Sequence, residues 1–576
     1  MKQVLMVAAE NGAFKGAKVG GMADVIRDLP QALLSQDVRV HVAMPSYGFL
    51  AAQEHGEKLN AFSLEFAGGQ QQVSVYRVNA ASKEVGEGRS KVNQTKTYLF
   101  DHPLFNDGGQ IYSHGDASRP FAADASKFAF FSLCVAKALV LEIIPRPDVL
   151  HLHDWHAGTL ALLRHYVNEF SSLKSLPCVY SIHNLGIQGL RPLSGDQSSL
   201  FHWFSHYGDE IKQQGLSEVI DPTHSQCYNP MRAGIVLSDK VHLVSPSYAK
   251  EVLLPSAPEK GSYCGEGLEQ DLQLKQQNGQ VFGILNGCFY DENQDLAPTP
   301  WVEQAEATLL SWQGLGQHQV DHQYVRSVDQ IALQRINRLL FSSHHSDSTN
   351  QTNRTNSTND TNDTISTKGT DKRADSRFLL TSVGRLTDQK VLILRQTILS
   401  QTTDKTVTVL EAILQCLKRH QPNGLFVMLG SGDVKISQEF QMIASRYANF
   451  IFLNGYDEPL ANTLYRQGHL FLMPSSFEPC GISQMLAMAQ GQPCLVHSVG
   501  GLKDTVQHGV TGWHFSGDDL KAQGEQLIMA LDTLLDSSQK EGYGSQAWKR
   551  VCANAKEQRF DWPKVAEQYC QSLYNQ

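Results

Sequence analysis

Val4-Leu5-Met6-Val7-Ala8-Ala9 opens the chain, and Val19-Gly20-Gly21 and an amphipathic stretch from Met22 to Leu34 follow it. An apolar run of about six residues is typical of a buried strand, and paired glycines before a helical pattern are typical of a tight turn. A strand, a glycine turn and a helix in this order predict the first unit of a parallel sheet that helices cover.

The same alternation of strand and helix continues along the chain. Helical stretches such as Thr408–Lys418 and Gln484–Gln490 separate the apolar runs of the second half. Two α/β lobes of the Rossmann type are therefore expected, with a deep cleft between them and ligands at the carboxyl ends of the strands. The further strands are predicted at Val38–Met44, Val149–His153, Val179–His183, Lys240–Ser245, Phe378–Val383, Leu425–Leu429, Phe450–Leu453, Leu470–Met473 and Pro493–His497.

Composition excludes several classes of protein. The 576 residues are 41% hydrophobic and 19% charged, which excludes collagen, a coiled coil and a wholly disordered chain. A net charge of −9 disfavours binding to nucleic acid or to anionic membranes. We expect no signal peptide and no membrane span, because no charged leader or long apolar stretch is present. The ten cysteines form no Cys-x-x-Cys pair, which argues against structural zinc and favours reduced thiols in the cytoplasm.

One segment fits neither lobe. From Ser346 to Thr367, 16 of 22 residues are Ser, Thr or Asn, and a Thr-Asn-x unit repeats along the segment. Such a composition buries too little apolar surface to offset the loss of chain entropy on ordering. We expect a disordered insertion over about residues 342–376. The Asn-x-Thr sequons arise from the repeat itself, so glycosylation is not expected.

The run His151-x-His153-Asp154-x-His156 offers imidazoles and a carboxylate directly after a predicted strand. Such a cluster is chemically suited to zinc or to a metallohydrolase. The aspartate, however, falls one position earlier than in hydrolases of the metallo-β-lactamase type, and no partner cluster follows at a recognisable spacing. A hydrogen-bonding role at the sheet edge is therefore favoured over metal binding.

Two glycine-rich turns could approach a ligand through their backbones. Lys18-Val19-Gly20-Gly21-Met22 could hold an anion at a helix N-terminus, or be a plain tight turn with a solvated lysine. The residues alone leave both open. Gly430-Ser431-Gly432-Asp433 lacks the third glycine of a dinucleotide fingerprint, because position 435 is Lys. It is weak evidence for NAD and fits a strand-to-helix turn.

Charged residues follow two predicted strands of the second half. Arg385 and Lys390 come just after the strand at Phe378–Val383, and two cations at a strand end suit a diphosphate. Glu478 lies in the run Pro474–Gln484, which leads into a helix. Its carboxylate could accept hydrogen bonds from sugar hydroxyls or cap that helix.

Together these motifs resemble the bacterial glycogen synthase and plant starch synthase family, retaining glucosyltransferases of the two-lobed GT-B fold. The resemblance spans nearly the whole chain. Its ordered matches are Glu10, Lys18–Met22, His153–His156, Ile182–Asn184, Asn229–Gly234, Ser245–Tyr248, Gly265–Leu268, Gly283–Gly287, Gly384–Lys390, Gly455–Glu458, Phe477–Gly481, Gly500–Leu502 and Phe560–Trp562.

The resemblance implies an organisation and a reaction. It implies a first lobe over residues 1–280, a second over 281–555, and a terminal helix over 556–576 that returns to the first lobe. The implied reaction transfers glucose from ADP-glucose to the non-reducing end of glycogen or another α-1,4-glucan, with retention and without cofactor or metal. His183, Arg385, Lys390 and Glu478 are the implied catalytic residues. The implied substrate contacts are Glu10, Lys18, Gly20, Gly21, Asp24, Asp154, Asn184, Asn286, Tyr456, Cys480, Gly481, Gly500 and Gly501.

The chain departs from the family pattern at several positions. Cys288-Phe289 replaces an aliphatic-Asp pair, Ser476 replaces Arg, and Val391 replaces a Gly that could take positive φ more easily. A stretch at about Leu394–Val407 is also inserted. Another GT-B transferase, such as one making trehalose or sucrose phosphate, and a weak or non-catalytic glucan-binding paralogue therefore stay open. The residues decide neither between ADP-glucose and UDP-glucose nor the oligomeric state.

Overall fold

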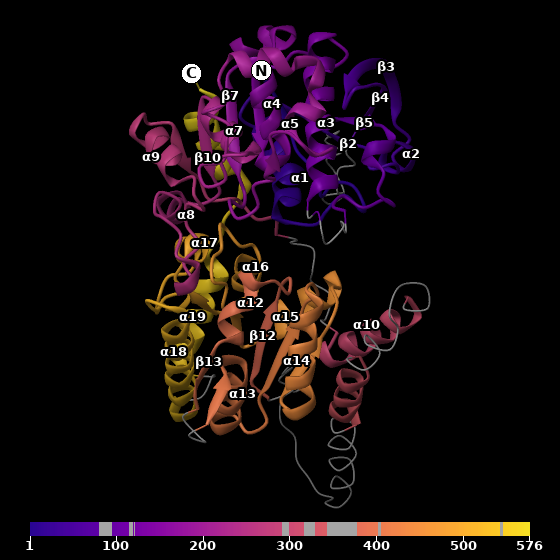
Figure 1. The fold of residues 1–576 in the computed structure, drawn as a ribbon. Helices are drawn as coiled ribbons and strands as arrows, with labels where there is room; N and C mark the ends of the chain where they lie inside the picture. Colours follow the sequence, from indigo (N-terminus) through magenta and orange to yellow (C-terminus); the bar gives the residue numbers. More distant parts are fainter. Residues whose placement is uncertain are drawn as a thin grey trace, which may run out of the picture.

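The computed structural model of the chain describes residues 1–79, 95–113, 119, 121–290, 299–315, 329–341, 377–400, 405–541 and 545–575. The predicted insertion at about 342–376, with its Thr-Asn-x repeat and sequons, lies outside these residues. Two α/β lobes lie one above the other in Figure 1, and each is built around its own sheet. The predicted fold class, a two-lobed α/β architecture, is confirmed.

The first sheet has nine strands in the order β11-β10-β7-β6-β1-β2-β5-β4-β3. Neighbours pair in parallel except in the antiparallel meander β3-β4-β5. Every residue of β6 and β7 is buried, as expected for strands that helices cover on both faces. The strands are β1 (Lys2–Val7), β2 (Val38–Pro45), β3 (Glu57–Phe66), β4 (Gly69–Asn79), β5 (Lys96–Asp101), β6 (Val149–His153), β7 (Cys178–Ile182), β10 (Lys240–Leu243) and β11 (Val281–Gly283).

The second sheet has six parallel strands in the order β16-β15-β12-β17-β18-β19. Short pairs β8 (Arg191–Pro192) with β9 (Cys227–Tyr228) and β13 (Thr397–Leu399) with β14 (Thr406–Thr408) lie outside both sheets. The strands of the second sheet are β12 (Leu379–Val383), β15 (Leu425–Leu429), β16 (Phe450–Leu453), β17 (Leu470–Met473), β18 (Cys494–His497) and β19 (Gly512–Phe515).

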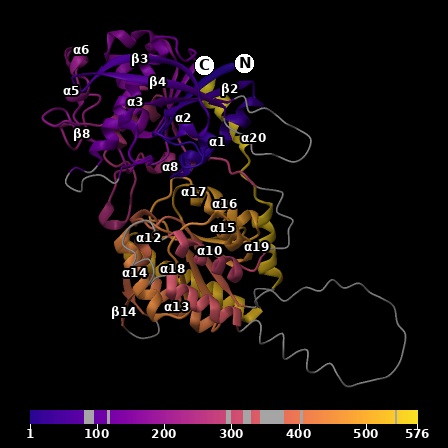
Figure 2. The ribbon, with the colours of Figure 1, turned by 90° about the vertical axis from the view of Figure 1, so that its right-hand side faces the viewer.

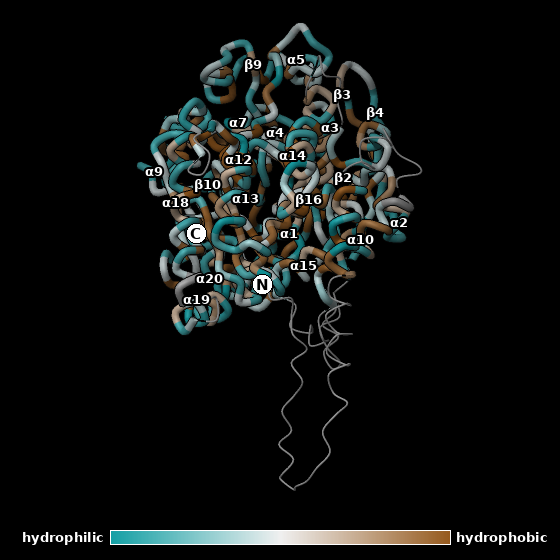
Figure 3. The backbone as a smooth tube through the Cα atoms, turned by 90° about the horizontal axis from the view of Figure 1, so that it is seen from below, coloured by the Kyte–Doolittle hydropathy of each residue, from teal (hydrophilic) through white to brown (hydrophobic). Residues whose placement is uncertain are grey.

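Helices cover both sheets, and the hydrophobic segments run through the interior while α9 lies at the hydrophilic periphery (Figure 3). The first lobe contains α1 (Gly21–Leu34), α2 (Leu50–Gln53), α3 (Ala122–Val140), α4 (Asp154–Tyr166), α5 (Leu200–Trp203), α6 (Gly208–Gln213), α7 (Pro230–Leu237), α8 (Pro246–Glu251) and α9 (Glu269–Gln277). The second contains α10 (Trp301–Leu315), α12 (Asp388–Arg395), α13 (Val409–His420), α14 (Val434–Arg446), α15 (Glu458–Gln467), α16 (Ser483–Ala489), α17 (Gly500–Thr505), α18 (Leu520–Glu541) and α19 (Gln546–Glu557).

The chain returns to the first lobe at its end. Helix α20 (Trp562–Tyr569) lies beside α1 in the upper lobe (Figure 2), and a π-helical turn, Cys570–Tyr574, follows it. Trp562, Tyr569 and Tyr574 are buried in the core of the first lobe. The ammonium group of Lys240 donates hydrogen bonds to three backbone carbonyls of this terminal segment at 2.8–3.2 Å.

Two departures from the family pattern are explained by local structure. Val391 lies inside α12, where its N–H donates to the carbonyl of Thr387 at 3.1 Å, so this position requires no positive φ. The concern that valine would be strained there was wrong. The inserted stretch forms the hairpin β13–β14, whose Ile398 joins the core of the second lobe. None of the helices in the described ranges is long and apolar enough to cross a membrane.

Candidate active site

The carboxyl ends of the two sheets meet at the boundary between the lobes. Just past β10, the hydroxyl of Ser245 donates to the backbone carbonyl of Pro479 at 2.6 Å. Past β7, the side-chain amide of Asn184 lies 3.5 Å from the side-chain oxygen of Gln389. These contacts bring together the predicted site residues that follow strands of the first sheet and those that follow strands of the second.

Asp154 holds the backbone of the loop that contains His183. It begins α4 with φ of 53°, a left-handed conformation that aspartate tolerates better than most residues. Its Oδ1 accepts hydrogen bonds from the N–H groups of His183 at 2.7 Å and Asn184 at 3.4 Å. Burial raises the pKa of Asp154 to about 7, against the lowering effect of these two donors.

A chain of hydrogen bonds runs beneath this loop and has a single direction. The carbonyl of Ile284 can only accept, so Nε2 of His242 donates to it at 3.2 Å and Nδ1 of that ring must accept. The hydroxyl of Ser181 donates to this Nδ1 at 2.8 Å and accepts from Nε2 of His151 at 2.6 Å. Nδ1 of His151 then accepts from the hydroxyl of Tyr574 at 2.7 Å.

Of the other histidines of the predicted cluster, His153 lies against this chain, whereas His156 packs against Phe128 and Trp155. His153 stacks on His151 and, through its Nδ1, lies 3.0 Å from Nε2 of His183. Burial lowers the pKa of His183 and of His156 to about 3, and the pKa of His242 to about 4. These rings are therefore neutral near pH 7. Within the described residues, their nitrogens form no group of three or more metal-ligating atoms.

Glu10 occupies the glycine turn that was considered as an anion site. Its buried carboxylate accepts hydrogen bonds from the N–H groups of Val19 at 2.7 Å and Gly20 at 2.6 Å, and from the hydroxyl of Tyr112 at 2.7 Å. The turn thus binds an internal anion through the N–H of Gly20. Gly21 faces Ile482 of the second lobe.

Lys18 and Asp24 form an ion pair at 2.7 Å, and Asp24 also pairs with Arg27 at 2.9 Å. The side chain of Lys18 is 47% exposed, whereas that of Asp24 is 14% exposed. Burial acts to lower the pKa of Arg27, but its interactions with Asp28, Asp24 and Glu458 of the second lobe together raise it above the ordinary value. This corner of the boundary is therefore rich in both signs of charge.

Lys390 and Glu478 form an ion pair in the second lobe. The hydroxyl of Ser475 donates to the same oxygen of Glu478 at 3.1 Å, and the carboxylate is almost fully buried. Arg385 lies exposed in the loop between β12 and α12. Both predicted cations thus follow β12. Of the two, Lys390 pairs with the buried carboxylate of Glu478.

Gly500 and Gly501 pack directly on the segment that contains Glu478. The N–H of Gly501 donates to the carbonyl of Glu478 at 2.9 Å. A Cβ on Gly500 would lie 2.0 Å from that carbonyl oxygen, and a Cβ on Gly501 would lie 2.1 Å from the carbonyl oxygen of Cys480. No side chain fits at either glycine. The N–H of Gly500 donates to Glu251 of the first lobe at 2.8 Å.

Gln389 was not assigned a role from the sequence, although it lies within the Gly384–Lys390 motif. Its carbonyl accepts from the N–H of Ser476 at 2.8 Å and from the hydroxyl of Ser476 at 3.1 Å. Its side-chain amide donates to the carbonyl of Phe477 at 3.2 Å. Ser476, which stands where the family has arginine, therefore links α12 to the segment after β17 through hydrogen bonds.

The remaining predicted residues differ in accessibility. Tyr456 is 63% exposed, whereas Asn286 and Cys480 are buried. The buried side-chain oxygen of Asn286 has no hydrogen-bond partner within the described part of the chain. Burial raises the pKa of Cys480 to about 12, so its thiol is protonated. Gly481 takes φ of 76°, which glycine adopts without strain.

Comparisons with known proteins agree with this architecture. A model of the starch synthase catalytic domain matches residues 3–274, and a model of group 1 glycosyl transferases matches residues 390–535. The catalytic domain of Starch Synthase IV from Arabidopsis thaliana, solved with ADP and acarbose, superposes with a TM-score of 0.66. The superposition covers 100% of this chain and 99% of that one at 21% identity, which shows a shared fold.

Curated relatives match over the full length. A glycogen synthase of Streptococcus mutans is 29% identical over 584 residues, covering 100% of this chain and 99% of the relative. A glycogen synthase of Lactococcus lactis is 29% identical over 592 residues, covering 100% of each. The chain belongs to the glycogen synthase and starch synthase family of glycosyltransferases.

Proposed function

We propose that this glycosyltransferase is a cytoplasmic glycogen synthase that transfers glucose from ADP-glucose to the non-reducing end of an α-1,4-glucan with retention. The observation that carries the proposal is the pair Lys390–Glu478 beside exposed Arg385, at the strand end that faces the His183 loop. Full-length similarity to glycogen synthases supports the activity. The Arabidopsis structure, solved with ADP and acarbose, favours an adenine nucleotide donor.

The donor diphosphate would lie against Arg385 and Lys390. Cleavage of the sugar–phosphate bond passes through an oxocarbenium-like state, and negative charge grows on the departing diphosphate. Cations held in place before reaction stabilise that charge without reorganisation. Lys390 meets this requirement, since its ammonium group pairs with Glu478, whose carboxylate also accepts a hydrogen bond from the hydroxyl of Ser475. We assign the carboxylate of Glu478 to the hydroxyls of the transferred sugar.

His183 would act through its backbone carbonyl, near the anomeric carbon. Its ring is neutral and hydrogen-bonded to His153, so the ring is not a proton donor near pH 7. Asp154 restrains the backbone on both sides of that carbonyl. The unpartnered oxygen of Asn286 suits a hydroxyl donor, since leaving it buried and unpaired costs about 1–3 kcal/mol.

The other predicted contacts support substrate binding at the edges of the site. The backbone near Gly20, Gly21, Gly500 and Gly501 would approach the donor, and Lys18 would contribute charge from the first lobe. We also assign substrate contacts to Glu10, Asp24, Asn184, Tyr456, Cys480 and Gly481.

The test is a direct assay of the purified chain with glycogen and either ADP-glucose or UDP-glucose. We expect release of ADP together with elongation of glycogen, and a higher kcat/KM for ADP-glucose. Elongation with a preference for UDP-glucose would overturn the donor assignment. Glycogen binding without nucleotide release would identify a glucan-binding paralogue. Nucleotide release that needs another acceptor would identify another transferase. Activity abolished by EDTA would favour the metallohydrolase alternative.

A further inference from the structure

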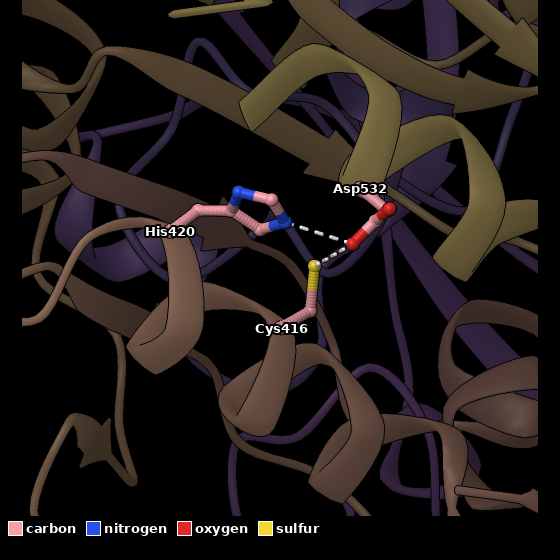
Figure 4. A group of neighbouring side chains, drawn as sticks. All are labelled: Cys416, His420 and Asp532. Atoms are coloured by element: carbon pink, nitrogen blue, oxygen red, sulfur yellow. Dashed lines mark hydrogen bonds and ion pairs between the residues drawn. The ribbon is translucent and has the colours of Figure 1, made fainter. Parts of the chain in front are cut away.

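A group of metal-ligating side chains lies in the second lobe, outside the site described above. Cys416 and His420 are one turn apart on α13, and Asp532 lies on the neighbouring helix α18. Figure 4 shows the three side chains pointing toward one another. Their sulfur, nitrogen and oxygen atoms lie within 4.8 Å of one another. We propose that these three residues bind a divalent transition-metal ion, with Zn²⁺ preferred, that links α13 to α18.

The separations between the donor atoms are close to those around zinc. Nε2 of His420 lies 2.8 Å from Oδ1 of Asp532, and Sγ of Cys416 lies 3.7 Å from the same oxygen. Zinc bonds of about 2.3 Å to sulfur and about 2.0–2.1 Å to nitrogen or oxygen give tetrahedral separations of roughly 3.3–3.5 Å. The two separations to Oδ1 of Asp532 differ from these by about half an ångström or less, and the ligand atoms of Cys416 and His420 lie within 4.8 Å of each other.

The ligand types select among metals. A thiolate with an imidazole suits zinc better than Ca²⁺ or Mg²⁺, which favour oxygen ligands. Three protein ligands leave the fourth position to water. A cavity of about 50 Å³ beside Cys416, lined also by Ala412 and Gln415, offers room for that water.

A purely structural interpretation of the same cluster is an ion-pair network. Asp532 accepts hydrogen bonds from His420 at 2.8 Å and pairs with Arg419 at 3.0 Å. This network accounts for Asp532, and it gives Cys416 a weak contact with Asp532 at 3.7 Å and an interaction with Arg419. Arg419 is 40% exposed and pairs with the same Oδ1 as His420, but a carboxylate has two oxygens, so the guanidinium can shift to Oδ2 while a metal takes Oδ1.

The proposed metal site and the proposed active site lie at opposite edges of the second sheet. His420 ends α13, and β15 begins five residues later, at Leu425, so the cluster lies at the amino-terminal edge of the second sheet. Arg385 and Lys390 follow the carboxyl end of β12, at the opposite edge. Figure 1 accordingly shows α13 at the end of the second lobe away from the first. The metal would stabilise the lobe and take no part in glucosyl transfer.

The experiment titrates the metal-stripped full chain with Zn²⁺ and, separately, with Co²⁺. We expect binding of about one Zn²⁺ per chain and a thiolate-to-cobalt charge-transfer band in the absorption spectrum. Melting temperature should rise by at least about 2 °C at a Zn²⁺ concentration near 100 times Kd. A wild-type chain that binds no Zn²⁺, or a Co²⁺ complex without this band, would overturn the proposal.

Variants separate this site from adventitious metal binding. Cys416→Ser should lose the charge-transfer band, and both Cys416→Ser and His420→Gln should bind Zn²⁺ at least about 100-fold more weakly. Cys552→Ser is the matched control, because it removes a half-buried thiol from α19. It should bind both metals like the wild type. Folding of each variant is checked by circular dichroism and by activity without metal. Equal Zn²⁺ affinity in wild type and folded Cys416→Ser would contradict the assignment.

Discussion

Arg385 and Lys390 are the residues on which the proposed chemistry depends most. Removing one electrostatic stabiliser of a transition state typically lowers kcat by about 10²–10³-fold. We expect Arg385→Ala and Lys390→Ala each to lose kcat on this scale while the chain folds normally. Steady-state kinetics with ADP-glucose and glycogen measure the loss.

Lys390→Ala has a second consequence, since it leaves the buried carboxylate of Glu478 with Ser475 as its one remaining side-chain donor among the residues that the structure describes. Lys390→Ala should therefore also be less stable than Arg385→Ala. Lys549→Ala, at an exposed position of α19, is the control and should change neither quantity. Near-normal kcat in both site variants would contradict the proposed roles.

Gly501 offers a test of packing at the same site. An added Cβ would meet the backbone of Cys480, which cannot move away as a flexible side chain could. Gly501→Ala should cost about 1–3 kcal/mol of stability, because such overpacking displaces the Glu478–Cys480 segment. Chemical denaturation measures the change. Gly384→Ala is the control, since its Cβ would meet nothing within 4 Å, and equal stabilities of the two variants would refute the argument.

At the scale of elements, Tyr574 links the terminal segment to β6. Its hydroxyl is the only donor that the described structure gives Nδ1 of buried His151. Tyr574→Phe keeps the ring but leaves that nitrogen unpaired, at a cost of about 1–3 kcal/mol. Thermal and chemical unfolding should both show the loss. Tyr76→Phe, on the partly exposed face of β4, should be nearly neutral.

The histidines of β6 and β10, together with His183 just after β7, predict a stability that depends on pH. Burial depresses their folded pKa values, so below about pH 6.5 the unfolded chain binds more protons than the folded chain. Stability must then fall as pH falls through this range. Asp154 acts in the opposite direction, because its folded pKa is raised to about 7.

The histidines outnumber Asp154, so acidification should destabilise the protein. We expect the free energy of unfolding to drop by at least about 2 kcal/mol between pH 7 and pH 5. Denaturant titrations at the two pH values measure the drop. A stability that is unchanged, or that increases on acidification, would show that the rings are not held neutral.

Elements with strong local patterns could be predicted from the sequence, and those that depend on distant partners could not. The strands predicted at Val149–His153 and Leu425–Leu429 form with these bounds, because short apolar runs are buried on both faces. The meander β3–β5 was missed, since it alternates polar and apolar residues without a helix between its strands. Arg385 and Glu478 could be placed at the carboxyl edge of the second sheet, because each follows a predicted strand.

The partners of the site residues could not be predicted in the same way. The bond from Glu10 to Gly20 and the pair Lys390–Glu478 join segments whose mutual orientation no local pattern encodes. The cluster of Cys416, His420 and Asp532 joins helices more than a hundred residues apart, so a search for closely spaced cysteine pairs passes over it. Tertiary packing creates these contacts.

At the scale of the whole molecule, the Thr-Asn-x segment is predicted to be dispensable. Its composition cannot support a packed core, and the entropy of closing a surface loop grows only with the logarithm of its length. Deleting Ser346–Thr367 should leave melting temperature and activity nearly unchanged. A large loss of either would show that the segment contributes to the fold.

Limited proteolysis tests the proposed division of the chain at residues 280 and 555. β11, an edge strand of the first sheet, begins at Val281, immediately after the first proposed boundary. We expect early cleavage within 342–376, because exposed polar segments are preferred sites of cleavage. The two lobes should survive longer. First cleavage within the 1–280 or 377–555 ranges would contradict this division.

The return of α20 to the first lobe bears on how the protein is completed during synthesis. Tyr569 and Tyr574 fill the core of a lobe whose strands have all been made by residue 283. Emerging chains usually fold their N-terminal unit first. Here the core of the first lobe stays incomplete until Tyr569 and Tyr574 have left the ribosome. The second lobe, built from a continuous stretch that ends earlier, has all its partners sooner. The first lobe to be translated is the last to be finished.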